Sequence, residues 1–559
     1  MTIKLADDSF TSDPDGAAIP IHSQIESPIG APLESINPLG TDVHFMSAVL
    51  LSLSAMVGVG VISTPGVVVQ VVGSLGLAFL LWILGSLVTF CGLASYMELA
   101  SRFPGRSEGD AVFLEQAYPR PRYMVATVFG LFSAMRYNAA ISATVFAEYA
   151  MHALDVPVTS LRHKSLTVAM ITLVLGLCAL STRWSLKVVN GLGFLKLASM
   201  TFIIFSGFAV LLGVTRIQNP ADNLRNPFLG SNWGANTLVS GYIKVDYAFG
   251  GWNQAIIFLS EVSTSQKITT ADGSPGPATT AFSTIRRATY VAVALASIIF
   301  LLINLSFFAA LPKESLSRTD SLVGVLFCEQ VYGTDSFVAT RLFPAMVALS
   351  CLGSMVAHAL SQARLVRETA RQGVLPYPEL LSSTWPFGTP VGPLAVQWVI
   401  SVLVIVIPPA ASSFSFLVSM HMYPTNVFQM LTALGVWTLR AQLDIVETFH
   451  AWTGFVVIFA AKCFLTVIMP WIPPAGGPQT GNPGTWYATY CLVGIGIISL
   501  GIVYYLSWMV VLPRLGGYTI VEETVTMEGG ALTNKFKKSK REAITFSPDN
   551  EHRLPLMDG

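Results

Sequence analysis

The sequence predicts an all-α integral membrane protein with about twelve transmembrane helices. Of its 559 residues, 52% are hydrophobic and only 11% are charged, with a mean hydropathy of +0.60. This composition is too apolar for a soluble globular protein. Apolar stretches of about 20 residues, the length that crosses the hydrocarbon core of a bilayer, begin near residues 44, 74, 123, 165, 189, 239, 288, 338, 391, 412, 452 and 486.

The chain divides into a central helical domain and two tails. Residues 1–42 are polar and acidic, carry no secretory signal and predict a disordered cytosolic N-terminal tail. Residues 43–513 hold the twelve predicted helices. Residues 514–559 are again polar and predict a cytosolic C-terminal tail, in which we interpret the basic run "KFKKSKR" as solvated. A role of that run in binding lipid headgroups or in regulation stays open.

The distribution of Lys and Arg predicts the orientation of the helices. Basic residues collect on the cytosolic side of membrane proteins. With both tails inside, and leaving the tails out of the count, the cytosolic segments hold 13 Lys and Arg and the outer segments hold 7. We therefore expect both termini to be cytosolic.

The first predicted span is interrupted by small residues and a proline. Residues 56–66 read "MVGVGVISTPG", and glycine and proline weaken a helix. Irregular backbone at membrane depth is tolerated where it lines a cavity or is buried in protein. The break therefore indicates a cavity, although close helix packing on small residues is an alternative interpretation.

A second interruption lies five spans later. The sixth span reads "YIKVDYAFGGWNQAIIFLSEV", with Gly250 and Gly251 at its middle. Broken helices at corresponding positions in two halves are typical of transporters with inverted repeats, here about 43–214 and 239–440, followed by helices at about 452–513. Free N–H groups at a half-helix suit a carboxylate, and free carbonyls suit an ammonium. The two breaks together suit a zwitterion such as an amino acid.

Four basic residues fall in or near the spans and are functional candidates, because a buried charge in a membrane is costly. They are Arg136, Lys196, Lys244 and Lys462. Lys196 follows "VVNGLGF" inside the fifth span. We interpret Lys244 and Lys462 as helix-end residues that extend their ammonium groups toward water.

Enzymes, metalloproteins and channels are disfavoured. The eight histidines are scattered, and we interpret His358 and His421, which lie in different spans, as isolated packing residues. The six cysteines show no paired spacing for a metal site or a disulfide framework. No stripe of polar residues repeats along a span as a channel would need. We expect no cofactor and no metal.

The interrupted spans and several other segments resemble a known family. "MVGVGVISTPG", "YAFGGWNQ", "YMELASRFPGRSEGDAVFLEQAYPRPR" and "RQGVLPYPELL" resemble the amino acid, polyamine and organocation (APC) transporter superfamily, in its L-type amino-acid transporter branch. "FAALPKESLSRTDSLVGVLFCEQVYG" and "HMYPTNVF" resemble the fungal high-affinity methionine permeases. The resemblance covers about residues 44–510 and implies a 5+5 inverted-repeat (LeuT-like) fold with helices 1 and 6 broken.

The resemblance also implies a substrate site at the two breaks. Its residues would be Met56, Val57, Gly58, Val59, Gly60 and Val61 in the first span, Tyr247, Ala248, Phe249 and Gly250 in the sixth, and Ser354 and Asn426 in the side-chain pocket. The N–H groups of residues 59–61 would bind the carboxylate. Carbonyls of residues 56 or 57, 247 and 250 would bind the ammonium.

Three further residues have roles that the resemblance implies. Tyr247 would be an aromatic gate. Lys196 would occupy the place of a sodium ion in related transporters, which implies either proton coupling or a fixed internal cation. Glu261 would form a cytosolic ion pair. The outer segment "LDVPVTSLRHKS" lacks the cysteine that links animal L-type exchangers to a glycoprotein partner, so we expect no disulfide-linked heavy chain. The segment at 263–287 departs from the family as a longer, flexible insertion.

We therefore expect a permease of the plasma membrane that moves neutral L-amino acids, methionine or other large neutral ones, by alternating access with proton symport. Two alternatives stay open. The same fold serves as a non-transporting amino-acid receptor or sensor, since fold does not fix function, and the protein could instead be an amino-acid exchanger.

Overall fold

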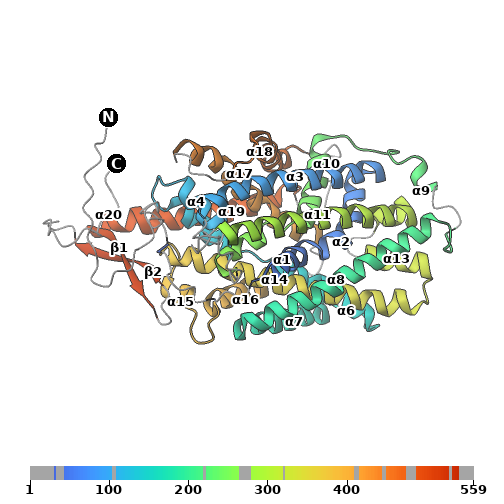
Figure 1. The fold of residues 1–559 in the computed structure, drawn as a ribbon, viewed down its shortest axis with the longest axis horizontal. Coiled ribbons are helices and arrows are strands. Elements are labelled where there is room, and N and C mark those ends of the chain that lie inside the picture. Colours follow the sequence, from blue (N-terminus) through green and yellow to red (C-terminus); the bar gives the residue numbers. More distant parts are fainter. Residues whose placement is uncertain are drawn as a thin grey trace, which may run out of the picture.

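The computed structural model describes residues 31–32, 39, 43–103, 109–217, 222–262, 279–318, 322–407, 414–442, 449–473, 486–527 and 532–540. In this part of the chain the protein is a bundle of helices with a two-stranded β-hairpin at one end (Figure 1). Most of the predicted N-terminal tail, most of the 263–287 insertion and the last 19 residues lie outside the described residues.

The helices follow the predicted spans in order. The predicted first repeat contains α1 (Phe45–Met56), α2 (Val59–Val72), α3 (Leu75–Arg102), α5 (Met124–Ala134), α6 (Asn138–Ala153), α7 (Ser160–Leu180) and α8 (Thr182–Leu211). The predicted second repeat contains α10 (Ala235–Ala248), η2 (Gln254–Glu261), α11 (Thr279–Ala310), η3 (Val338–Leu342), α14 (Phe343–Arg371), α16 (Val391–Val406) and α17 (Phe414–Gln442). The last helices are α18 (Thr453–Ile468), η4 (Met469–Trp471), α19 (Thr489–Tyr505), η5 (Leu506–Val511) and α20 (Leu512–Gly516).

Short elements join the long helices. They are α4 (Asp110–Ala117), α9 (Asp222–Arg225), α12 (Lys313–Ser317), α13 (Val323–Tyr332) and α15 (Pro378–Ser382), with strands β1 (Tyr518–Thr526) and β2 (Leu532–Lys540). Helices α4 and α15 lie at the end of the bundle that carries β1 and β2, which we call the hairpin end, and α9 lies at the opposite end (Figure 1).

The outer surface of the bundle fits a lipid environment. Among the described residues, nine helical segments are long and apolar enough to cross a membrane, and α16 is a shorter apolar helix. Large apolar side chains such as Phe205, Phe464 and Leu500 are more than half exposed on the bundle, which would be unfavourable in water over so wide a surface. The protein is an integral membrane protein, and the total of twelve spans stays a prediction.

Side-chain caps mark where three helices begin, and a glycine marks where α2 ends. The hydroxyls of Ser74, Thr159 and Ser181 accept hydrogen bonds from backbone N–H groups in the first turns of α3, α7 and α8. Such caps satisfy N–H groups that have no partner within the helix. Gly73 ends α2 with a φ of 76°, a left-handed conformation that favours glycine.

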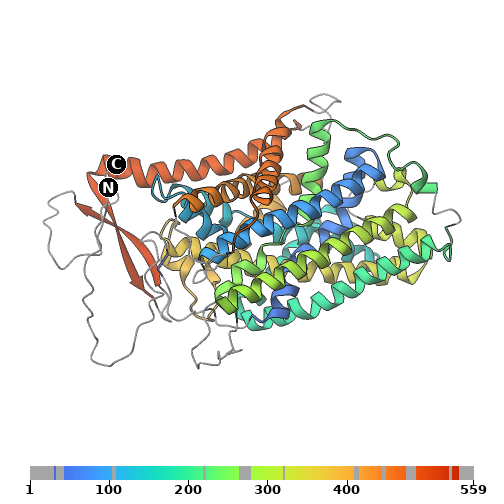
Figure 2. The same cartoon turned by 45° about the horizontal axis from the view of Figure 1, so that its top comes forward.

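The segment after α20 is structured where the sequence suggested a solvated tail. Strands β1 and β2 pair antiparallel from Tyr518 opposite Lys540 to Thr526 opposite Leu532, and the hairpin extends beyond the helices (Figure 2). Glu522 accepts hydrogen bonds from the Arg122 guanidinium at 3.0 Å and the Tyr123 hydroxyl at 2.6 Å. The alternating Thr, Val and Ile of β1 favour a strand, and these contacts hold it on the bundle.

Candidate substrate site

The first break separates α1 from α2 inside the bundle. Val57 and Gly58 leave the helical conformation between the two helices, and Pro65 lies within α2, one to two turns beyond the break. The first backbone N–H groups of α2 and the last carbonyls of α1 therefore lack intrahelical partners. Both ends are buried, so the break presents donors and acceptors within the protein interior.

The second break separates α10 from η2 and packs directly against the first. A Cβ atom on Gly60 would lie 2.5 Å from the Ala248 Cα, and one on Gly251, at φ 108°, would lie 2.4 Å from the Ala55 Cβ. Real Cβ atoms do not approach other atoms this closely. The glycines thus allow the two irregular segments to meet, which explains why both spans carry them.

A cavity of about 1090 Å³, counting the part that is open to solvent, lies against both breaks. Its wall comes from α1, α2, α4, α5, α6, α14, α17 and the segment from α10 to η2. It extends toward the hairpin end. Asp110 on α4, a helix at that end, lines it, and so does Leu365 in the half of α14 that leads to the hairpin contact of Arg371. The two stacked rings of Phe132 and Phe428, 4.8 Å apart, form an aromatic part of the wall.

About half of the residues that the resemblance placed in the site line this cavity. They are Met56, Val59, Gly60, Tyr247, Gly250 and Ser354. The others lie next to them: Val57, Gly58, Val61, Ala248 and Phe249 are buried behind the breaks. The Phe249 ring packs at 4.8 Å from that of Phe300. The amide of Asn426 faces Met422 and Lys462 rather than the cavity space.

Lys196 is bound to the end of α1. Its ammonium donates to the Ser54 carbonyl at 2.7 Å and to the Ser354 hydroxyl at 2.8 Å, and that hydroxyl donates to the same carbonyl at 2.8 Å. The Lys196 side chain is 1% exposed. The Lys196 side chain therefore binds a free carbonyl of the first break and connects α8 with α1 and α14.

The cavity wall holds polar residues that sequence reasoning did not assign to the site. They are Asp110, Arg136, Asn138, Ser142, Asp246, Asn253, Gln254, His358, Ser361, Gln362, His421, Thr425 and Gln429. His358 and His421 are not isolated packing residues, because both line the same cavity. The signal was the presence of ionisable side chains within spans, but the sequence does not show which spans face one another.

Asp110 places a carboxyl group in the cavity wall, and its hydrogen bonds and surroundings affect its pKa. Tyr96 and Thr432 donate hydrogen bonds to its Oδ1 atom, the latter at 3.0 Å. Burial raises the pKa of the Asp110 carboxyl above its ordinary value, while the hydrogen bonds from Tyr96 and Thr432 act in the opposite direction. The cationic Arg136 lines the same cavity and also lowers this pKa.

The interpretation of Lys244 and Lys462 as helix-end residues was wrong. Their side chains are buried, at 5% and 7% exposure. Lys244 donates to the Ser419 hydroxyl at 2.5 Å, and Lys462 lies 2.8 Å from the Asp246 carboxylate. Both lysines find oxygen partners on neighbouring helices, which makes burial tolerable and which no local sequence pattern reveals.

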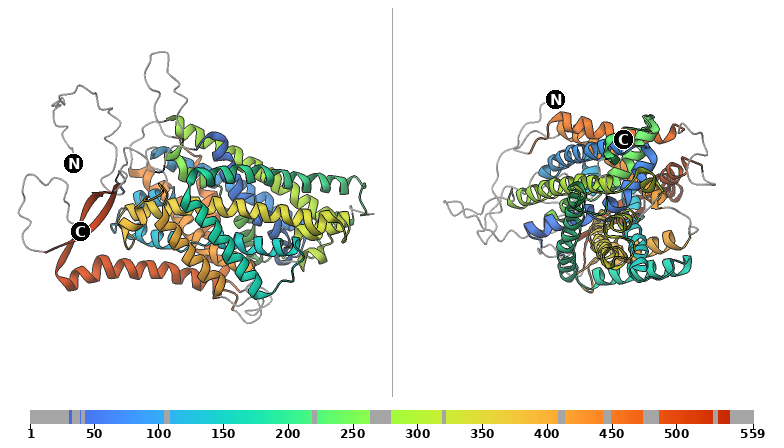
Figure 3. Two further views of the ribbon diagram at one scale, coloured as in Figure 1. Left: turned by 90° about the horizontal axis from the view of Figure 1, so that it is seen from below. Right: turned by 90° about the vertical axis from the view of Figure 1, so that its right-hand side faces the viewer.

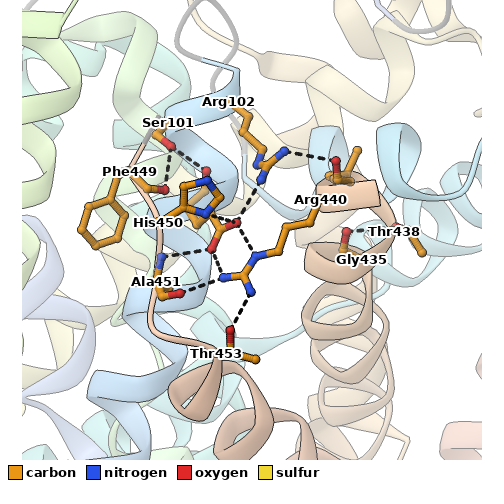
Figure 4. Close-up of polar contacts among 11 residues, drawn as sticks. Ser101, Arg102, Gly435, Thr438, Arg440, Phe449, His450, Ala451 and Thr453 are labelled. Carbon is orange, nitrogen blue, oxygen red and sulfur yellow. Dashed lines mark hydrogen bonds and ion pairs between the residues drawn. The ribbon is translucent and has the colours of Figure 1, made fainter. Parts of the chain in front are cut away.

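Two charged clusters hold the helices around the cavity at the hairpin end. The expected ion pair of Glu261 is confirmed, with Arg364 Nη2 at 2.8 Å from its Oε2 atom. In the second cluster Glu98 accepts hydrogen bonds from Arg102, from Arg440 and from the Ala451 N–H (Figure 4). This carboxylate joins the ends of α3 and α17 to the start of α18.

Comparison with known proteins agrees with this architecture. Residues 43–498 match the family model described as amino acid permease. The chain is 25% identical to the high-affinity methionine permease of Saccharomyces cerevisiae over 88% of its own length and 83% of the relative, and 22% identical to the low-affinity methionine permease of that yeast over 90% and 88%. It is 27% identical to the human cystine/glutamate transporter over 61% and 62%. With its membrane-length helices broken at a central cavity, the chain belongs to the amino acid permease family, whose members are transporters and not enzymes.

Proposed function

We propose that the protein is a secondary active transporter that moves neutral L-amino acids, methionine or other large neutral ones, by alternating access. The observation that carries this proposal is the pair of broken helices meeting at one cavity, with backbone donors and acceptors beside aromatic side chains. Such a site suits a zwitterion with an apolar side chain. The likeness to two yeast methionine permeases supports methionine as a substrate.

In this proposal the backbone binds the part common to all amino acids. The N–H groups of Val59, Gly60 and Val61 at the start of α2 receive the carboxylate, where the helix dipole favours negative charge. Carbonyls of Met56 or Val57, with those of Tyr247 and Gly250, receive the ammonium. The substrate side chain then lies toward the apolar wall that Phe132 and Phe428 form.

Alternating access requires that each half of the path close in turn. Tyr247 lies in the last turn of α10 beside the cavity, and its ring packs 5.9 Å from that of Phe414, so it is the proposed outer gate. We assign the hairpin end to the cytosol, on the strength of the basic residues predicted to be inside. The cavity, which extends toward that end, then represents the inward-facing side of the cycle.

We further propose proton coupling through Lys196 and a stand-alone permease at the plasma membrane. Lys196 bridges α1, α8 and α14, so a change in its protonation would alter contacts between helices that move relative to one another. The segment at 154–165 has no cysteine, and all six cysteines are buried. Both facts support a transporter without a disulfide-linked heavy chain.

The deciding experiment is uptake of labelled L-methionine and L-leucine by proteoliposomes that contain the purified protein, with and without an inward proton gradient. Accumulation driven by the gradient is the expected result for a symporter. Uptake that needs amino acid inside the vesicles would identify an exchanger. Tight binding without flux under either condition would contradict transport and favour a receptor.

A further inference from the structure

A buried ion pair forms part of the cavity wall beside the proposed gate. Asp246 Oδ2 and Lys462 Nζ are 2.8 Å apart, and the two side chains are 10% and 6% exposed. Asp246 directly precedes Tyr247 on α10 and lines the cavity. Lys462, on α18, is not among the residues that line it. The carboxylate is therefore at the wall and the ammonium lies behind it.

The ammonium of Lys462 is held in place by three oxygen atoms. Besides Asp246, it contacts Asn426 Oδ1 at 2.8 Å and Gln429 Oε1 at 3.2 Å. The two amide oxygens accept hydrogen bonds from the ammonium, and the Asp246 carboxylate is its ion-pair partner. The Phe459 ring lies 5.4 Å from the same nitrogen. Lys462 is thus fixed between α10 and α17, and it is not free to leave the carboxylate for solvent.

Two further ionisable side chains close to the pair add no charge at neutral pH. Tyr242 on α10 interacts electrostatically with Asp246, and Cys463 on α18 interacts with both members of the pair. Phenol and thiol groups are neutral at pH 7. The pair therefore presents a wall of zero net charge next to the gate, although one of its members is a carboxylate.

We propose that the Asp246–Lys462 pair sets the charge selectivity of the substrate site, with Lys462 as the built-in counter-charge that keeps Asp246 from recruiting cationic side chains. The inference rests on the proposed transport of neutral amino acids and adds the residues that enforce neutrality. An uncharged substrate side chain needs no charged partner in the wall. The ammonium or guanidinium group of a cationic side chain gains little from Asp246, because that carboxylate is already paired with Lys462.

Removing either partner has opposite consequences. Lys462→Met leaves the carboxylate without its counter-charge, so L-lysine gains an electrostatic partner in the cavity wall. Asp246→Asn leaves the Lys462 ammonium without its counter-charge, so the side-chain carboxylate of L-glutamate gains an electrostatic partner instead. The double variant removes both charges. An uncompensated buried charge is strongly unfavourable. Each single variant should therefore gain the most binding affinity, relative to wild type, for a substrate whose side-chain charge restores neutrality.

The test measures binding of labelled L-lysine, L-glutamate and L-methionine to the purified full-length protein in detergent. The measured quantity is the ratio of the Kd for L-glutamate to that for L-lysine, which does not depend on the fraction of folded protein. Lys462→Met should raise the ratio about tenfold and Asp246→Asn should lower it about tenfold. The double variant should return it near the wild-type value.

The control is a buried ion pair away from the cavity. Glu261→Gln breaks the contact with Arg364, and neither residue lines the cavity, so this variant should lose stability without changing the ratio. Equal ratios of the two Kd values in wild type, Lys462→Met and Asp246→Asn would overturn the proposal. The pair would then only stabilise the packing of α10 and α18. If Lys462→Met does not fold, Asp246→Asn alone decides by the direction of its change. Wild-type binding of L-methionine in the same assay tests separately whether the site receives a neutral amino acid, and uptake by proteoliposomes tests the proposed transport.

Discussion

Gly60 is the residue on which the contact between the two broken helices depends. Its missing side chain allows α2 to approach Ala248 at the end of α10. In Gly60→Ala the new Cβ would lie 2.5 Å from the Ala248 Cα. Because backbone cannot move aside as a flexible side chain can, we expect a cost of about 1–3 kcal/mol and an uptake rate of L-methionine reduced about tenfold.

Gly176→Ala is the matched control for this prediction. Gly176 lies within α7, and a Cβ added there meets no atom within 4 Å. Alanine favours a helix by about 1 kcal/mol over glycine, so this variant should be at least as stable as wild type and should transport normally. Equal uptake by both variants would show that the close approach of α2 and α10 is not needed.

Lys196 allows a test of coupling at a single side chain. In Lys196→Met the Ser54 carbonyl and the Ser354 hydroxyl lose their shared cation. We expect uptake that no longer responds to an inward proton gradient, measured in proteoliposomes across a range of external pH. Lys187→Met on the same helix is the control, because the Lys187 ammonium lies over the Trp184 ring rather than at a break. A Lys196→Met protein with full pH dependence would exclude this lysine as the coupling group.

At the scale of helices, the sequence predicts the breaks but not their partners. Gly58, Gly250 and Gly251 leave a local signature, because glycine weakens a helix at the point where it occurs. Pro65 was part of the same motif, yet the helix continues through it and the break lies at Val57 and Gly58. Which segment packs against each break depends on close contact from another helix, and the local sequence does not contain that information.

Contacts between helices depend on helix rotation, which the sequence leaves open. Lys462 and Asp246 are far apart in the chain, and nothing local to either indicates that they pair. Asn426 was predicted to line the side-chain pocket, but it is not among the residues that line the cavity and its amide is directed at Lys462. The 3.6-residue period predicts which residues share a face and does not predict which neighbour that face meets.

The Glu98 cluster should account for much of the stability of the hairpin end. Its carboxylate is fully buried and is paired with Arg440 at 2.6 Å and Arg102 at 3.0 Å. Glu98→Gln removes the charge and leaves two guanidinium groups without their counter-ion, which we expect to lower the free energy of unfolding by about 3 kcal/mol. Thermal unfolding of the purified protein measures this. Glu314→Gln, an exposed position on α12, should change little, and equal shifts in the two variants would contradict the role of the cluster.

At the scale of the whole molecule, the bundle has two distinct ends. The left view of Figure 3 places the hairpin beyond one end of the bundle. Arg122 and Arg371 contact the hairpin there, and the cavity extends in the same direction. If basic residues mark the cytosolic side, the substrate path in this conformation leads to the cytosol.

Cysteine labelling in intact cells tests this orientation. All six native cysteines are buried, so the wild-type background should be low. Ser539→Cys places a thiol on an exposed position of β2, and Val158→Cys places one at a 60% exposed position between α6 and α7, at the opposite end. A maleimide that does not cross membranes should label Val158→Cys in intact cells and Ser539→Cys only after permeabilisation. The reverse pattern would place the hairpin outside, and the cavity would then be the outward-facing half of the cycle, with Tyr247 on the cytosolic side of the substrate.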